Sequence, residues 1–189
     1  MTENKIVLLQ WGVVIGASLI AAVLDLRARR IPNLLCVPLF AAGLFQAAWQ
    51  TGVGGLGNAF LAGVVLALPF VILFVFAGGG AGDAKLMAAI GAWLGVERVI
   101  IVLACVCIAG GVLAIGTAIM KKRLRIVLAN ILLSVYSFII AILGKRGIKA
   151  ASDLARPELM DKLTIPYGVA IFAGVCLAAV VNLLSTIDY

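Results

Sequence analysis

Long apolar stretches alternate with short polar connections along most of the 189-residue chain. About 20 mostly apolar residues are needed to cross the hydrocarbon core of a bilayer, so each long stretch is a candidate membrane-spanning helix. The pattern predicts six spans, over residues 6–24, 34–49, 56–77, 86–95, 99–120 and 165–184. We therefore expect an all-α polytopic membrane protein that forms a single domain over residues 1–189.

Two segments depart from this pattern. Residues 86–95 would rise only about 15 Å as a helix, which is half of the hydrocarbon thickness. The preceding Gly78–Gly82 run is expected to be irregular backbone, which survives at membrane depth only where protein or water covers it. Residues 124–143 are apolar enough to make a seventh crossing, but basic clusters bracket them and polar residues recur on one helical face. We favour an interfacial amphipathic helix there.

The basic residues gather at alternate ends of the predicted spans. Arg27, Arg29 and Arg30 follow the first span, Lys85 opens the fourth, and nine more lie between residues 121 and 162. An outside N-terminus places 13 of the 15 lysines and arginines in the cytoplasm, as the positive-inside rule prefers. The net charge of +7 therefore reflects membrane topology. A nucleic-acid partner is not expected, because it would require a folded basic surface outside the membrane.

Composition narrows the chemistry further. With 65% hydrophobic and 12% charged residues, the chain is not an ordinary soluble domain. It has no histidine, and its four cysteines form no C-x-x-C pair. This excludes Ser-His and Cys-His nucleophile pairs and histidine-ligated zinc. No metal or other cofactor is implied. The first apolar run is too long for a typical signal peptide and is expected to remain as a span.

Two aspartates border predicted spans: Asp25 ends the first, and Asp83 precedes the fourth. If residues 34–49 and 56–77 both cross, the two carboxylates emerge on the same side of the membrane. Acidic residues at such positions are rare and costly, so each is a functional candidate. The structural alternatives are that Asp25 pairs with Arg29, one helical turn on, and that Asp83 caps a helix beginning at Ala84.

Two carboxyl groups that meet can hydrolyse a peptide bond without histidine or metal. Close together they share one proton. The ionised member takes a proton from a water, which attacks the scissile carbonyl. The protonated member hydrogen-bonds the carbonyl oxygen and stabilises the charge developing there. An aspartic peptidase built on Asp25 and Asp83 is therefore a candidate.

Three stretches resemble the type IV prepilin peptidases and their preflagellin-peptidase relatives. They are Asp-Leu-Arg-Ala-Arg-Arg-Ile-Pro-Asn at 25–33, Gly-Ala-Gly-Asp-Ala-Lys at 80–85 and Ile-Pro-Tyr-Gly at 165–168. The second matches the Gly-x-Gly-Asp-x-Lys signature of the GxGD aspartic peptidases. The resemblance implies that Asp25 and Asp83 are catalytic, in a bacterial inner membrane with the site facing the cytoplasm. It also implies a prepilin substrate with a short basic leader, and the pilus assembly machinery as a candidate partner.

The chain departs from the larger members of that family, which carry a cytoplasmic insertion with paired C-x-x-C zinc motifs associated with N-methylation. Here a short basic turn joins Asp25 to Asn33. The chain is therefore similar to the short, tight-adherence type that acts on Flp-like pilins. We expect peptidase activity without methyltransferase activity.

Five other motif residues are candidates for substrate binding or for shaping the site. Gly80 and Gly82 would allow unusual dihedrals and close approach to substrate. Lys85 would bias Asp83 towards ionisation, attract an acidic substrate group or anchor the span. Pro166 and Tyr167 would shape the site, or start the last helix and anchor it at the interface.

Further motif residues are expected to be structural. Pro32 fits a turn ahead of the second span, and Asn33 is expected to cap that helix.

Two other functions remain open from the residues alone. A proton-coupled transporter would also use intramembrane aspartates, although near the midplane of the bilayer rather than at one interface. A membrane assembly subunit would pack against partners through small-residue faces such as Gly12/Gly16 and Gly110/Gly111, which are also expected to serve internal packing.

Overall fold

The computed structural model describes residues 2–77, 80–120 and 167–187. They form five helices, α1 (Thr2–Ala28), α2 (Asn33–Ala77), α3 (Ala81–Leu94), α4 (Val96–Met120) and α7 (Tyr167–Ile187). Because these ranges contain no strand, the all-α prediction is confirmed for them. The predicted interfacial helix over 124–143 lies outside the described residues, and so does the basic region around it.

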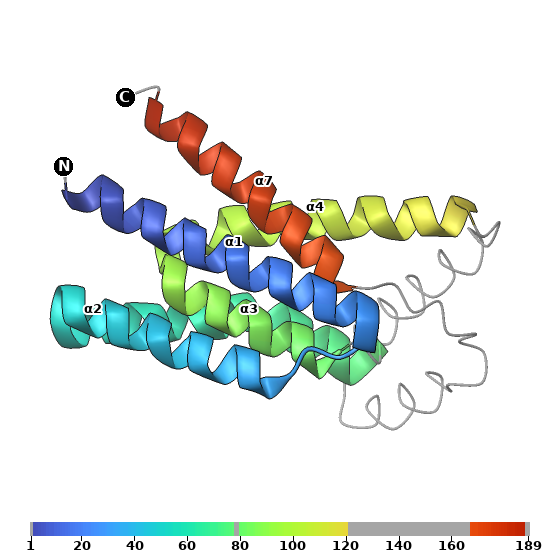
Figure 1. Cartoon of the computed structure of the whole chain (residues 1–189), viewed down its shortest axis with the longest axis horizontal. Coiled ribbons are helices and arrows are strands. Elements are labelled where there is room, and N and C mark those ends of the chain that lie inside the picture. The colour runs from blue at the N-terminus through green and yellow to red at the C-terminus, as the bar shows by residue number, and fades with distance from the viewer. Residues whose placement is uncertain (1, 78–79, 121–166, 188–189) are drawn as a thin grey trace, which may run out of the picture.

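Helix α2 consists of two antiparallel arms. A straight helix of its 45 residues would be about 68 Å long, more than twice the hydrocarbon thickness. Instead the backbone leaves the helical region at Thr51 and at Gly52, which has a φ of 66°. The chain reverses there, and Phe40 of the first arm packs against Gly63 of the second (Figure 1). The arms correspond to the stretches predicted over 34–49 and 56–77.

Among the described helices, α1, α2, α4 and α7 are long and apolar enough to cross a membrane. The candidate stretch in α2, Asn33–Val75, has 43 residues, which is enough for two crossings. Helix α3 has only 14 residues and rises about 21 Å, less than the roughly 30 Å of hydrocarbon. A membrane protein is thus indicated, whereas the count of six crossings remains a prediction.

Helix α3 is the most enclosed of the described helices, since 10 of its 14 residues are buried. It packs closely against both arms of α2. A Cβ added to Gly91 would lie 2.5 Å from the carbonyl oxygen of Ala62. The indole of Trp93 fills the space beside Gly43 and donates its N–H to the carbonyl oxygen of Leu39 at 2.8 Å. Protein therefore covers the helix that carries Asp83.

The glycines that bring helices together differ from those expected. A Cβ on Gly12, Gly16 or Gly111 would meet nothing within 4 Å, so for these three the expected role in internal packing is wrong within the described residues, whereas a Cβ on Gly110 would lie 3.9 Å from Ala170 Cβ of α7. The backbone of a neighbouring helix approaches Gly91 on α3 and Gly174 on α7 instead. Spacing alone does not reveal which face of a helix meets a neighbour.

Candidate active site

Asp25 lies in the last turn of α1, and its carboxylate contacts the beginning of α7. The backbone N–H of Gly168 donates to Asp25 Oδ2 at 2.8 Å. Gly168 is buried, and an added Cβ would lie 2.9 Å from Asp25 Cβ and 3.1 Å from Oδ2. The first N–H groups of a helix have no partner within it, so Asp25 satisfies one of those of α7.

The bond observed between Asp25 and Arg29 is in the backbone, from the Arg29 N–H to the Asp25 carbonyl oxygen at 2.9 Å. Arg29 has a φ of 51° and ends α1 in the left-handed conformation common after a helix. The Asp25 carboxylate accepts its hydrogen bond from α7.

Asp83 lies in the first turn of α3 and is only 9% exposed. The helix begins at Ala81, so the expectation that Asp83 caps a helix starting at Ala84 is wrong. Gly80 holds the capping position, and its carbonyl oxygen accepts the Asp83 N–H at 3.2 Å. Irregular backbone was also expected at Ala81 and Gly82, and both are helical; residues 78–79 lie outside the described ranges.

Gly80 and Gly82 provide space rather than unusual dihedrals. Gly80 has a φ of −78°, and Gly82 is helical. A Cβ on Gly80 would lie 2.7 Å from Asp83 Oδ2, because the Asp83 carboxylate folds back over this residue. A Cβ on Gly82 would lie 3.0 Å from Ile31 Cβ. The expected unusual dihedrals are therefore wrong, and close packing at both glycines is observed.

The carboxylates of Asp25 and Asp83 are close enough to interact electrostatically. Asp83 precedes the predicted span at 86–95 and lies outside the four membrane-crossing candidates. Burial first, and the negative charge of Asp25 second, raise the pKa of Asp83 from 3.8 to about 7. The charge of Asp83 also acts on the Cys36 thiol and the Tyr167 hydroxyl, so residues of α1, α2, α3 and α7 share one electrostatic environment.

Lys85 joins the beginnings of α2 and α3. Its Nζ donates to Asn33 Oδ1 at 2.9 Å. The carbonyl oxygen of Pro32 accepts the first N–H groups of α2, from Leu35 and Cys36. Pro32 therefore starts the helix, and the expectation that Asn33 caps it is wrong. The causes that raise the pKa of Asp83 are burial and the charge of Asp25.

The three sequence motifs meet at one end of the bundle. Asp25 contacts Gly168, and the two stretches at 25–33 and 80–85 are joined by the Gly82–Ile31 and Lys85–Asn33 contacts. The end of α1 lies beside the start of α7, at the end of the bundle away from both chain termini (Figure 1). Tyr167 begins α7 and is 42% exposed, whereas Pro166 lies outside the described residues.

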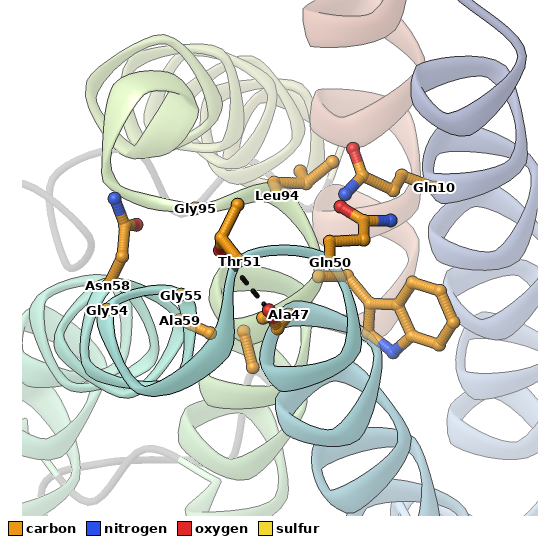
Figure 2. A pocket seen from close by; sticks show the side chains of 12 residues that line it. Gln10, Ala47, Gln50, Thr51, Gly54, Gly55, Asn58, Ala59, Leu94 and Gly95 are labelled. Atoms are coloured by element: carbon orange, nitrogen blue, oxygen red, sulfur yellow. Dashed lines mark hydrogen bonds between the residues drawn. The ribbon is translucent and has the colours of Figure 1, made fainter. Parts of the chain in front are cut away.

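A polar pocket of about 270 Å³ lies at the opposite ends of α1 and α3 from the aspartates. Figure 2 shows Gln10, Thr51 and Asn58 around the connection from Leu94 to Gly95. Asn58 Oδ1 accepts the Val96 N–H at 2.9 Å and so caps α4. Arg98 donates to Gln10 Oε1 at 3.3 Å. These groups join helix ends and are separate from the carboxylate pair.

Sequence reasoning missed two residues of the site. Gly168 belongs to the third motif, but the sequence suggested a role in the site only for its neighbours Pro166 and Tyr167. Its position at the start of a helix was the available signal, because unpaired N–H groups gather there. Cys36 is 2% exposed and lies within reach of the charges of Asp83 and Lys85. No spacing or composition pointed to it.

Comparison with known families supports the motif assignment. The model described as the type IV leader peptidase family matches residues 12–115, more than half of the chain. This range contains Asp25, Asp83 and the first two motifs, and it ends before Gly168. No match was found among curated proteins or among solved structures.

Proposed function

The chain belongs to the type IV leader peptidase family, and we propose that it is an aspartic endopeptidase whose catalytic pair is Asp25 and Asp83. Family membership indicates a protease in a membrane. The observation that supports the aspartic assignment is that two acids from separate helices, one of them buried, lie close enough for the charge of Asp25 to raise the pKa of Asp83. Both lie at helix ends, which distinguishes the site from the midplane acids of a carrier.

In the proposed reaction the ionised carboxylate takes a proton from a water, and the water oxygen attacks the peptide carbonyl carbon. The protonated carboxyl gives its proton to the carbonyl oxygen, which yields a neutral gem-diol. The C–N bond then breaks. The first carboxyl passes its proton to the leaving amine, and the second recovers a proton from a diol hydroxyl. Both groups return to their starting states.

We propose that the substrate is a type IV prepilin of the Flp-like class, cut at the cytoplasmic face of the inner membrane. The pilin's apolar helix would hold its leader junction near the membrane surface. The aspartates lie in the last turn of α1 and the first turn of α3, which suits that depth. Only four residues separate α1 from α2, which supports peptidase activity without the methyltransferase activity linked to an insertion there.

A cleavage assay tests this proposal. The chain is co-expressed with a candidate Flp-like prepilin, and leader removal is followed by mass spectrometry. Asp25→Asn and Asp83→Asn keep the side-chain size but cannot ionise, so each should leave the precursor uncut while accumulating in the membrane. Glu97→Gln is the matched control, since Glu97 is exposed at the other end of the bundle. Normal cleavage by either asparagine variant would remove that residue from the mechanism.

A further inference from the structure

Resting on the proposed function, we infer that Gly168 is a positioning residue. Its backbone N–H holds Asp25 as the ionised base of the pair, and Asp83 is the member that carries the proton. This assigns different roles to two acids that the reaction alone leaves interchangeable.

The contact at Asp25 favours the negatively charged form. A backbone N–H can only donate, so the 2.8 Å bond from Gly168 presents a donor to Asp25 Oδ2. Hydrogen bonds to a carboxylate favour its ionised form. Gly168 is the second residue of α7, and the amino end of a helix carries a partial positive charge that attracts anions.

The surroundings of Asp83 favour the neutral form. Its side chain is buried and folds over Gly80. Burial and the charge of Asp25 both raise its pKa, to about 7. The charge of Asp83 acts on Cys36 and Tyr167, and the ammonium of Lys85, two residues on in α3, is bonded to Asn33. The three arginines that follow Asp25, at 27, 29 and 30, are exposed.

The roles in the reaction follow from this arrangement. Asp25 takes the proton of the attacking water, and the resulting hydroxyl oxygen forms the new bond to carbon. Asp83 gives its proton to the carbonyl oxygen. After the C–N bond breaks, the proton on Asp25 goes to the amine, and Asp83 recovers one from the diol.

A side chain at Gly168 would disturb this bond directly, because an added Cβ would lie 3.1 Å from Asp25 Oδ2 and 3.2 Å from Ala22 Cα. Gly174 offers a matched control on the same helix. An added Cβ there would clash with the backbone and the side chain of Val106 of α4 instead. Both alanine variants perturb the packing of α7, and only one reaches Asp25.

The first test is the pH profile of single-turnover cleavage by the full-length enzyme. Loss of activity at low pH reports protonation of the base, and loss at high pH reports ionisation of the acid. Gly168→Ala should move the low-pH limb upward and leave the high-pH limb in place. Gly174→Ala should lower the amplitude and move neither limb. A Gly168→Ala profile that keeps both limbs, or moves only the high-pH limb, would overturn the inference.

A second measurement does not depend on the glycine variants folding. Infrared spectra of the purified protein at about pH 5.5, where ordinary carboxyls are ionised, report the carbonyl stretch of a protonated carboxyl. The band should persist in Asp25→Asn and disappear in Asp83→Asn. The reverse pattern would overturn the role assignment even if both variants fail to cleave. Normal cleavage by these variants would instead refute the proposed function itself. Failure of the role assignment and failure of the proposed function therefore give different results.

Discussion

Replacing Asp83 by asparagine should stabilise the protein at alkaline pH while abolishing cleavage. Asparagine has nearly the same shape but no charge, so it removes the cost of holding a buried carboxylate beside Asp25. A gain of stability with a loss of activity is expected at a catalytic residue, because the environment that shifts its pKa also destabilises its charged form.

The magnitude follows from the pKa of Asp83, which is 3.8 ordinarily and about 7 in the folded protein. Below pH 3.8 the carboxyl is protonated in both the folded and the unfolded states. As the pH rises towards 7, the unfolded chain releases the proton first, so the free energy of unfolding falls. One pKa unit corresponds to about 1.4 kcal/mol. Between pH 5 and pH 8 the wild type should therefore lose about 3 kcal/mol relative to Asp83→Asn.

Thermal unfolding in detergent measures this difference. Trp11 and Trp93 are buried, and their fluorescence reports unfolding. About 3 kcal/mol corresponds to roughly 6–12 °C for a chain of this size, so the gap between variant and wild type should widen by that much from pH 5 to pH 8. Glu97→Gln, at an exposed carboxylate, should show no comparable widening. A gap that stays constant across this range would refute the reasoning.

Three further predictions concern stability, each measured as the unfolding temperature in the same detergent. Asn58→Ala removes the acceptor that caps α4 and should cost about 1 kcal/mol, whereas Asn58→Asp keeps it and should not. Gly91→Ala forces a Cβ against the backbone of α2, whereas the Cβ of Gly111→Ala meets open space, so Gly91→Ala should destabilise the protein several times more. Equal effects of the two variants would contradict this packing. Arg29→Gly relieves a left-handed residue and should stabilise by about 1 kcal/mol; a loss of stability would show that the arginine side chain matters more than its backbone.

The sequence predicted where the two acids lie because that inference needs only the order of the spans. Asp25 and Asp83 follow and precede apolar stretches separated by the two arms of α2, and they interact electrostatically as that order allows. The residues that would shape the site were harder to assign. Glycine disfavours a helix by about 1 kcal/mol, which suggested irregular backbone at Gly82. Tertiary packing against Ile31 outweighs that preference.

Local preference also failed at Asn33, where the capping tendency of asparagine suggested a role within its own helix. The side chain accepts a hydrogen bond from Lys85 instead, 52 residues away. The contact between Asp25 and Gly168 is also long-range, because it joins residues 143 apart in the sequence. Local patterns identify helix ends, but they do not show which helix ends meet.

The meeting of helix ends explains why α7 belongs to the proposed catalytic unit. Asp25 lies in the last turn of α1, and the carboxyl end of a helix carries a partial negative charge that disfavours an anion. Asp83 has the opposite placement, in the first turn of α3, but burial and the charge of Asp25 outweigh the attraction of that helix end and raise its pKa. The amino end of α7 compensates Asp25 through the Gly168 N–H. The family match ends at residue 115, before this helix begins. Residues 12–115 therefore contain both aspartates but lack the Gly168 N–H that binds the Asp25 carboxylate, and they should not form an active peptidase without α7.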